Sequence, residues 1–119
     1  MVLLDPDNGF EPKGPFGNKH IRYSELAVIL DQIGDNSLLS VFQHFRRVKF
    51  EEDFRRIKGQ LGKFTAAVHI TGIYWHQLMF VLISKSAETI GRVRVMNKTY
   101  VRAIALTSRK SRVLNVIEA

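Results

Sequence analysis

Hydrophobic side chains recur with two different spacings along the chain. In residues 22–61 they return every three or four positions, which is the period of one face of an α-helix. In residues 63–118 they form short runs or alternate with polar residues, which is typical of strands. The order of the two patterns predicts an α+β fold in which three short helices precede a sheet.

The first helix is the clearest of the three. Leu26, Ile29, Leu30 and Ile33 occupy positions i, i+3, i+4 and i+7, which predicts a helix over residues 22–33. The glycine that follows is placed to end this helix, because glycine adopts the left-handed conformation of a helix C-terminus without strain.

The helical spacing continues through two further segments. Asp35, Asn36 or Ser37 is placed to cap a second helix that extends to about Lys49, since these side chains accept hydrogen bonds from the first helical amides. A third helix is expected over residues 51–61, where glutamates precede arginines by four positions and so stabilise the helix.

The second half predicts a four- to five-stranded antiparallel β-meander. Each separator between its apolar runs is only a few residues long, and parallel strands need a crossover of a dozen residues or more. The strands are expected at about residues 64–70, 74–84, 90–96, 99–107 and 112–118.

The apolar stretch 63–84 is expected to form the central hairpin. With Gly72 and Ile73 as its loop, His69 would lie opposite His76 near the tip. Both faces of this hairpin would be largely apolar, so both need cover. Helices can cover one face, and the other requires the N-terminal residues, a curled sheet or a second subunit.

Residues 1–20 contain all three prolines of the chain, which predicts an irregular arm. Phe10 and Phe16 are expected to hold this arm against the body or against a neighbouring subunit. The rest forms a single α+β domain over residues 21–119, with its helices in 22–61 and its sheet in 63–118.

Charge adds the first functional indication. The 119 residues carry a net charge of +7, which favours polyanionic partners such as nucleic acid, anionic lipid headgroups or acidic proteins. The positive charge lies in the last two thirds of the chain, because residues 1–36 have a net charge of −3. The chain has no cysteine, which excludes disulfides and cysteine-based zinc sites.

No apolar run approaches the ~20 residues of a membrane span. The acidic N-terminus also lacks the basic region of a signal peptide. We therefore expect an intracellular protein, cytoplasmic or nuclear, without a transmembrane segment.

Arg92 and Arg94 alternate along one predicted strand, and further basic residues follow in the next two strands and their connections, with Tyr100 among them. A basic sheet face with an aromatic side chain suits single-stranded nucleic acid, where phosphates follow the charges and bases stack. The alternative is an ordinary solvated face whose charges protect an edge strand. The candidate binding residues are Arg92, Arg94, Lys98, Tyr100, Arg102, Arg109, Lys110 and Arg112, with Arg46 and Arg47 as a second patch.

The predicted His69–His76 pair is the remaining chemical candidate. Two imidazoles across a hairpin can provide half of a metal site or acid–base chemistry on RNA. The alternative is two half-buried histidines beside a turn, and no third ligand is indicated, so no metal and no cofactor is expected. Phosphate-binding glycine loops and the common hydrolase signatures are absent from the sequence.

The sequence therefore favours a small, basic, non-enzymatic protein that binds nucleic acid, RNA or single strands in particular, as a homo-oligomer. The first alternative is a self-assembling structural or adaptor protein, of the viral matrix or accessory kind, that binds an anionic membrane or an acidic protein. The second is a small ribonuclease that uses His69 or His76.

Overall fold

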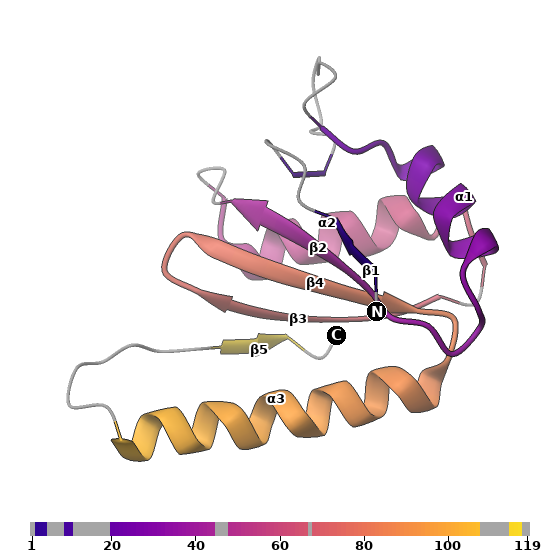
Figure 1. Ribbon diagram of the computed structural model, residues 1–119. Helices are drawn as coiled ribbons and strands as arrows, with labels where there is room; N and C mark the ends of the chain where they lie inside the picture. The colour runs from indigo at the N-terminus through magenta and orange to yellow at the C-terminus, as the bar shows by residue number, and fades with distance from the viewer. Residues whose placement is uncertain are drawn as a thin grey trace.

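A computed structural model describes residues 2–4, 9–10, 20–44, 48–66, 68–107 and 115–117, with the backbone alone at Val2 and 104–107. These residues form an α+β fold of three helices and a five-stranded mixed sheet (Figure 1). In chain order the elements are β1 (Val2–Leu4), α1 (Tyr23–Gln32), β2 (Leu39–His44), α2 (Phe50–Leu61), β3 (His69–Trp75), β4 (Leu78–Ser84), α3 (Ala87–Thr107) and β5 (Asn115–Ile117).

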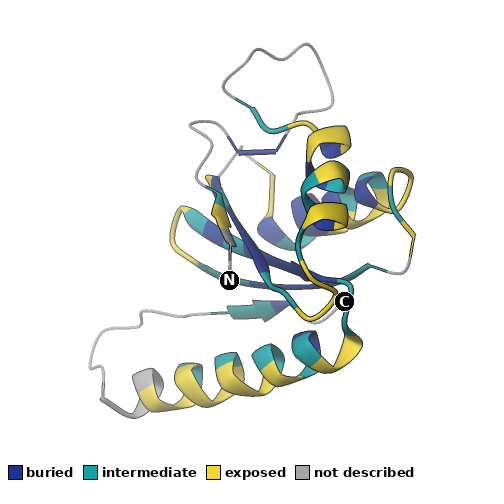
Figure 2. Ribbon diagram, turned by 45° about the vertical axis from the view of Figure 1, so that its right-hand side comes forward, coloured by how far each residue is buried: buried dark blue, intermediate teal, exposed yellow. Residues whose placement is uncertain are grey.

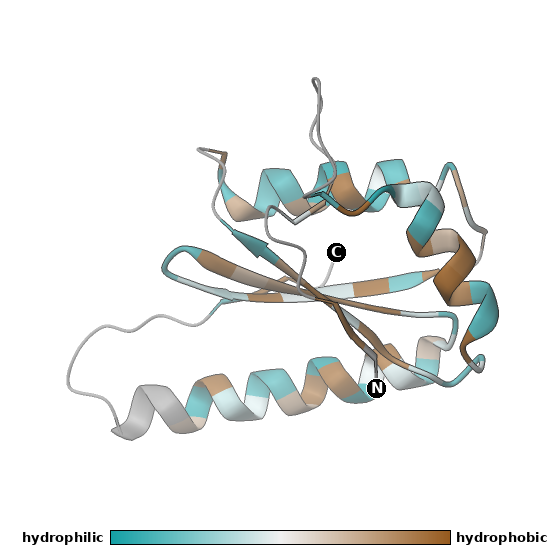
Figure 3. Ribbon diagram, turned by 45° about the horizontal axis from the view of Figure 1, so that its top comes forward, coloured by the Kyte–Doolittle hydropathy of each residue, from teal (hydrophilic) through white to brown (hydrophobic). Residues whose placement is uncertain are grey.

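The sheet is the middle of three layers. Its strand order is β1-β2-β4-β3-β5, and all neighbours are antiparallel except β1 and β2, which are parallel. Helix α2 covers one face together with α1, and α3 lies on the opposite side (Figure 3). The expected antiparallel meander is wrong in its connectivity, because β1 and β2 are parallel, and because β2 pairs with β4 and β3 pairs with β5.

The first and third predicted helices are confirmed as α1 and α2. Leu26 and Leu30 of α1 are buried, as are Phe54 and Ile57 of α2, so the apolar positions at helical spacing do face the sheet. These side chains form the main hydrophobic core together with inward residues of the sheet (Figure 2).

The predicted second helix is wrong, because the apolar middle of that segment forms strand β2. Leu39 and Val41 are fully buried in the main core, and strand alternation places Ser40, between them, on the other side of the sheet. The apolar positions of this segment fit a helical period and a strand period equally well. Pairing with β4 along the whole of β2 decides between the two, and that contact is distant in sequence.

The central hairpin exists, but its turn lies at His76 and Gln77 instead of Gly72 and Ile73. His76 has a φ of 56°, a left-handed conformation that histidine adopts more readily than most residues. Gly72 lies inside β3 and pairs with Val81. A Cβ atom at Gly72 would come within 3.1 Å of the Phe54 ring, so this glycine permits close packing of α2 instead of a turn.

Two predicted strands, 90–96 and 99–107, are wrong, because both belong to helix α3. The Ser86 hydroxyl accepts a hydrogen bond from the Thr89 amide at 3.1 Å and so caps the helix. Ile90 is buried on the inward side. The strand β5 lies within the predicted strand 112–118, and the Thr71 hydroxyl donates a hydrogen bond of 2.7 Å to the Ile117 carbonyl.

Two parts of the predicted N-terminal arm belong to the body of the protein. Val2–Leu4 form the edge strand β1, so this piece is a strand instead of irregular chain. Phe10 is fully buried in the core and stacks on Tyr23 with ring centroids 5.8 Å apart, which confirms that Phe10 holds the arm to the body. Phe16 lies outside the described residues.

None of the helices that the structure describes is both long enough and apolar enough to cross a bilayer.

Candidate nucleic-acid interface

Five of the predicted binding residues lie on a single element, α3, instead of on two strands and the turn between them. They are Arg92, Arg94, Lys98, Tyr100 and Arg102. The other five predicted residues, Arg46, Arg47, Arg109, Lys110 and Arg112, lie outside the described residues. The helix therefore decides which predicted side chains share a surface.

Arg94, Lys98 and Arg102 form one side of α3, which we call the basic flank. They are four positions apart, so they are in line and about 6 Å apart along the helix axis. The Arg94 guanidinium donates a hydrogen bond of 3.1 Å to the Ile70 carbonyl, which shows that this flank lies on the β3 side. Lys98 and Arg102 are exposed.

Arg92 lies on a different side of the helix and is not part of the basic flank. Its guanidinium forms an ion pair with Glu88 one turn earlier. The Thr89 hydroxyl on the same side donates a hydrogen bond of 3.4 Å to the Asn36 carbonyl, in the segment before β2. This side of α3 therefore faces the β2 half of the sheet.

Tyr100 lies on the β2 side of α3 as well. Val93, Met96 and Tyr100 follow one another at spacings of three and four residues, and we call them the apolar flank. The prediction that Tyr100 lies among the basic side chains is wrong, because a helix separates residues that a strand would interleave.

Two shallow polar hollows lie near the N-terminus of α3. One, of about 410 Å³, is lined by Asn36, Ser86, Glu88, Thr89, Arg92 and Val93. The other, of about 560 Å³, is lined by Asp31, Asp35, Asn36, Thr65, Ala66, Lys85 and Ser86, with Lys85 2.9 Å from Asp31. Neither contains a histidine, and Lys85 pairs with Asp31 in one while Arg92 pairs with Glu88 in the other.

The predicted histidine pair does not form. His69 pairs with Ser84 at one end of the hairpin, and His76 lies in the turn at the other. They are seven positions apart along the extended chain, which is about 23 Å. The described residues contain no group of three or more histidine and acidic side chains that could hold a metal ion. The hypothesis of a ribonuclease that uses His69 or His76 stays a prediction, without a pair of neighbouring histidines.

The polar contacts of α2 were not foreseen in their observed form. The Tyr74 hydroxyl donates a hydrogen bond to the Glu51 carboxylate, which lowers the pKa of Glu51. Partial burial and this carboxylate together raise the pKa of Tyr74 to about 12. The two residues are 23 positions apart and no local pattern links them, so the sequence carries no signal for the contact.

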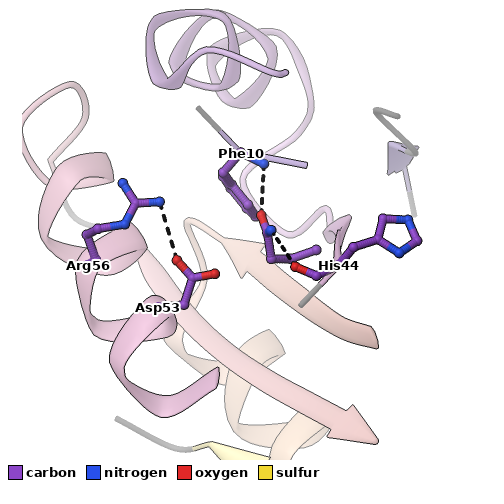
Figure 4. Close-up of polar contacts among 5 residues, drawn as sticks. Phe10, His44, Asp53 and Arg56 are labelled. Carbon is purple, nitrogen blue, oxygen red and sulfur yellow. Dashed lines mark hydrogen bonds and ion pairs between the residues drawn. The ribbon is translucent and has the colours of Figure 1, made fainter. Parts of the chain in front are cut away.

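Two further polar contacts fix α2 and the N-terminal segment in place (Figure 4). Arg56 pairs with the buried Asp53 at 3.3 Å. The buried side chain of Gln43 accepts a hydrogen bond of 2.9 Å from the Phe10 amide and donates one of 2.8 Å to the His44 carbonyl. These groups satisfy one another in the interior, so they stabilise the fold and are not available to a ligand.

Comparison with known proteins provides no further assignment, since no protein-family model, no curated protein and no solved structure matches this chain.

Proposed function

We propose that this protein binds nucleic acid through the basic flank of α3, by contacts to the phosphate backbone. The observation that carries the proposal is the alignment of Arg94, Lys98 and Arg102 on one side of a long helix. The acidic residue of α3, Glu88, lies at the other end and is already paired with Arg92. The basic flank therefore has no carboxylate of its own helix beside it.

The geometry of the flank suits a phosphate backbone. Its charges follow one another at about 6 Å along the helix, close to the distance covered by two nucleotides of a strand at about 3.4 Å each. Arg94 is held against β3, so the flank has a fixed orientation relative to the sheet. Three more basic residues, Arg109, Lys110 and Arg112, follow in the sequence and extend the positive charge.

The mode of binding differs from the one expected from the sequence. Single strands were favoured because a basic sheet face with Tyr100 would stack bases, but Tyr100 lies away from the basic flank. Contacts to phosphates are common to duplexes and single strands, and they carry no sequence information. The proposal is therefore backbone binding to RNA or DNA, with little preference among base sequences.

The test is a salt titration of binding to a duplex and to a single strand of mixed sequence. Replacement of Lys98 and Arg102 by glutamine should reduce the slope of log K against log salt by about 0.9 per lost phosphate contact on a duplex and about 0.7 on a single strand. The matched control is Arg92→Gln, which removes an arginine from the same helix but outside the basic flank. We expect this control to leave the slope unchanged.

Two outcomes would overturn the proposal. One is that the wild-type protein does not bind either oligonucleotide at low salt. The other is that the double variant and the control change binding equally. The same samples should be mixed with vesicles of anionic lipid, since the alternative of a membrane-binding adaptor predicts flotation with vesicles and no response to oligonucleotides.

A further inference from the structure

One half of the α3 side of the sheet is not covered by a helix among the described residues. Helix α3 lies against β3, β4 and β5, and the β1–β2 half is open beside it (Figure 1). Strand alternation places Phe42 and Phe80 on this side, because their neighbours Val41 and Val81 face the main core. The rings of Phe42 and Phe80 meet edge to face, with centroids 4.4 Å apart.

The open half-sheet continues to the edge strand. Leu3 pairs with Ser40, between the main-core positions of β2, so its side chain shares the face of Phe42. Leu3 is 54% exposed. Together Leu3, Phe42 and Phe80 form an apolar floor.

The apolar flank of α3 forms the wall beside this floor. The hydrogen bond from Thr89 to Asn36 shows that this side of the helix faces the β2 half. Met96 and Tyr100 of the flank are 69% and 57% exposed. The apolar floor of the sheet and the apolar flank of α3 thus border one corner of the molecule, and exposed apolar surface of this kind marks an interaction site.

We propose that the corner is the interface with a second copy of this chain, in a two-fold dimer whose partner helix α3 lies over the floor. Two-fold interfaces bring the same patch from both subunits together, so the patch must be complementary to itself. This corner meets that condition, because each copy offers the exposed apolar flank of α3 and a floor in which Leu3 is exposed and Phe42 and Phe80 are partly exposed. Helix α3 of each copy then covers the half-sheet of the other that its own α3 leaves open.

The distribution of charge supports a second copy as the occupant. Two chains of net charge +7 repel one another unless they meet where positive charge is low or paired. On the corner side of α3 the basic residue is Arg92, which is paired with Glu88. The basic flank lies on the opposite side of the helix, so it remains at the surface of the dimer. An acidic protein would instead be attracted to the basic flank.

Sedimentation of the wild-type protein and of Met96→Asp tests the interface. We expect the wild type at twice the chain mass and the variant at the chain mass, because the new carboxylate would be buried against apolar groups of the partner. The control is Val28→Asp, which makes the same change at a residue that is 56% exposed on α1, on the other face of the sheet. It should remain dimeric. Circular dichroism of all three proteins establishes that each is folded.

A cross-linking experiment tests the arrangement of the helices. Met96 lies near the middle of α3 on the apolar flank, so a two-fold axis beside this flank brings the two copies of residue 96 together. The natural chain has no cysteine, so Met96→Cys introduces a single thiol. Mild oxidation should convert this variant to a covalent dimer, and Val28→Cys should stay uncross-linked. A monomeric wild type, a dimeric Met96→Asp, or a dimer that Met96→Cys does not cross-link would overturn the proposal.

Discussion

Tyr74 and Glu51 connect strand β3 to the start of α2 through one hydrogen bond. The hydroxyl of Tyr74 stabilises the ionised carboxylate, so the pKa of Glu51 is lower in the folded protein than its usual 4.5. The carboxylate in turn opposes ionisation of the tyrosine, whose pKa is raised. The contact is therefore strongest at a pH at which Glu51 is ionised and Tyr74 is not.

The pH dependence of stability follows from these two shifts. A lowered pKa of Glu51 means that its contribution is complete above pH 4.5 and is lost as the pH falls below that value. The raised pKa of Tyr74 means that stability also declines as the pH rises from 10.0 towards about 12. We predict that Tyr74→Phe lowers the free energy of unfolding by about 1 kcal/mol at neutral pH.

Urea denaturation at a series of pH values measures this effect, with Glu51→Gln and the double variant completing a mutant cycle. The difference between wild type and Tyr74→Phe should shrink towards acid pH. A difference that is independent of pH, or equal in the Glu51→Gln background, would show that the hydroxyl does not act through this carboxylate.

Two glycines provide a second comparison at the scale of single residues. Gly9 has a φ of 78°, and a Cβ atom there would come within 2.4 Å of the Gln43 amide oxygen. Gly59 is a residue of helix α2 with open space around its Cα. The same substitution should thus have opposite effects at the two sites.

We predict that Gly9→Ala destabilises the protein by about 2 kcal/mol, because of left-handed backbone strain and the displaced Gln43 side chain. Gly59→Ala should stabilise it by about 1 kcal/mol, since alanine is the better helix former. Thermal unfolding of both variants measures the two shifts. A Gly9→Ala protein that unfolds at the wild-type temperature would contradict the anchoring of the N-terminal segment by Gln43.

At the scale of the elements, the stability of helix α3 depends on the contacts of its first turn. The side of α3 that faces the sheet includes the polar residues Arg94 and Asn97, so its apolar stripe is weak. Packing alone therefore stabilises this helix less. The Ser86 hydroxyl and the early Glu88 therefore contribute directly to where the helix begins.

We predict that Ser86→Ala lowers the free energy of unfolding by about 1 kcal/mol and that Ser86→Asp retains the wild-type value. Hydrogen exchange should show faster exchange in the first turn of α3 in the alanine variant. Equal stability of all three proteins would indicate that the cap is dispensable.

The sequence predicted the elements whose local pattern has a single interpretation. Helices α1 and α2 have apolar stripes bounded by plausible ends, and both are confirmed. Strand β2 and helix α3 were misassigned because valine, isoleucine and phenylalanine favour strands but also fill helix faces. In each segment the choice between helix and strand depends on contacts distant in sequence. Examples are the pairing of β2 with β4 and the hydrogen bond between Arg94 and Ile70.

The candidate site was predictable in its residues but not in its arrangement. The positive charge of α3 can be counted from the sequence, whereas the separation of Tyr100 from Lys98 and Arg102 requires the helical period. The corner formed with Phe42 could not be predicted, because it depends on where α3 crosses the sheet.

At the scale of the whole molecule, the three layers explain the composition of the central hairpin. Its strands are apolar on both faces because α1 and α2 cover one face and α3 covers part of the other. The expectation that both faces need cover is thus confirmed. The part that α3 leaves open is where the proposed dimer supplies the missing layer.

The short turn between β3 and β4 also has a consequence for the order of folding. These two strands pair across two residues, so their contact closes a very small loop and costs little chain entropy. The outer pairs, such as Val2 with Leu39 and Tyr74 with Asn115, close loops of tens of residues. Folding should therefore begin at the centre of the sheet and proceed outwards in both directions, with the two edges as its slow steps.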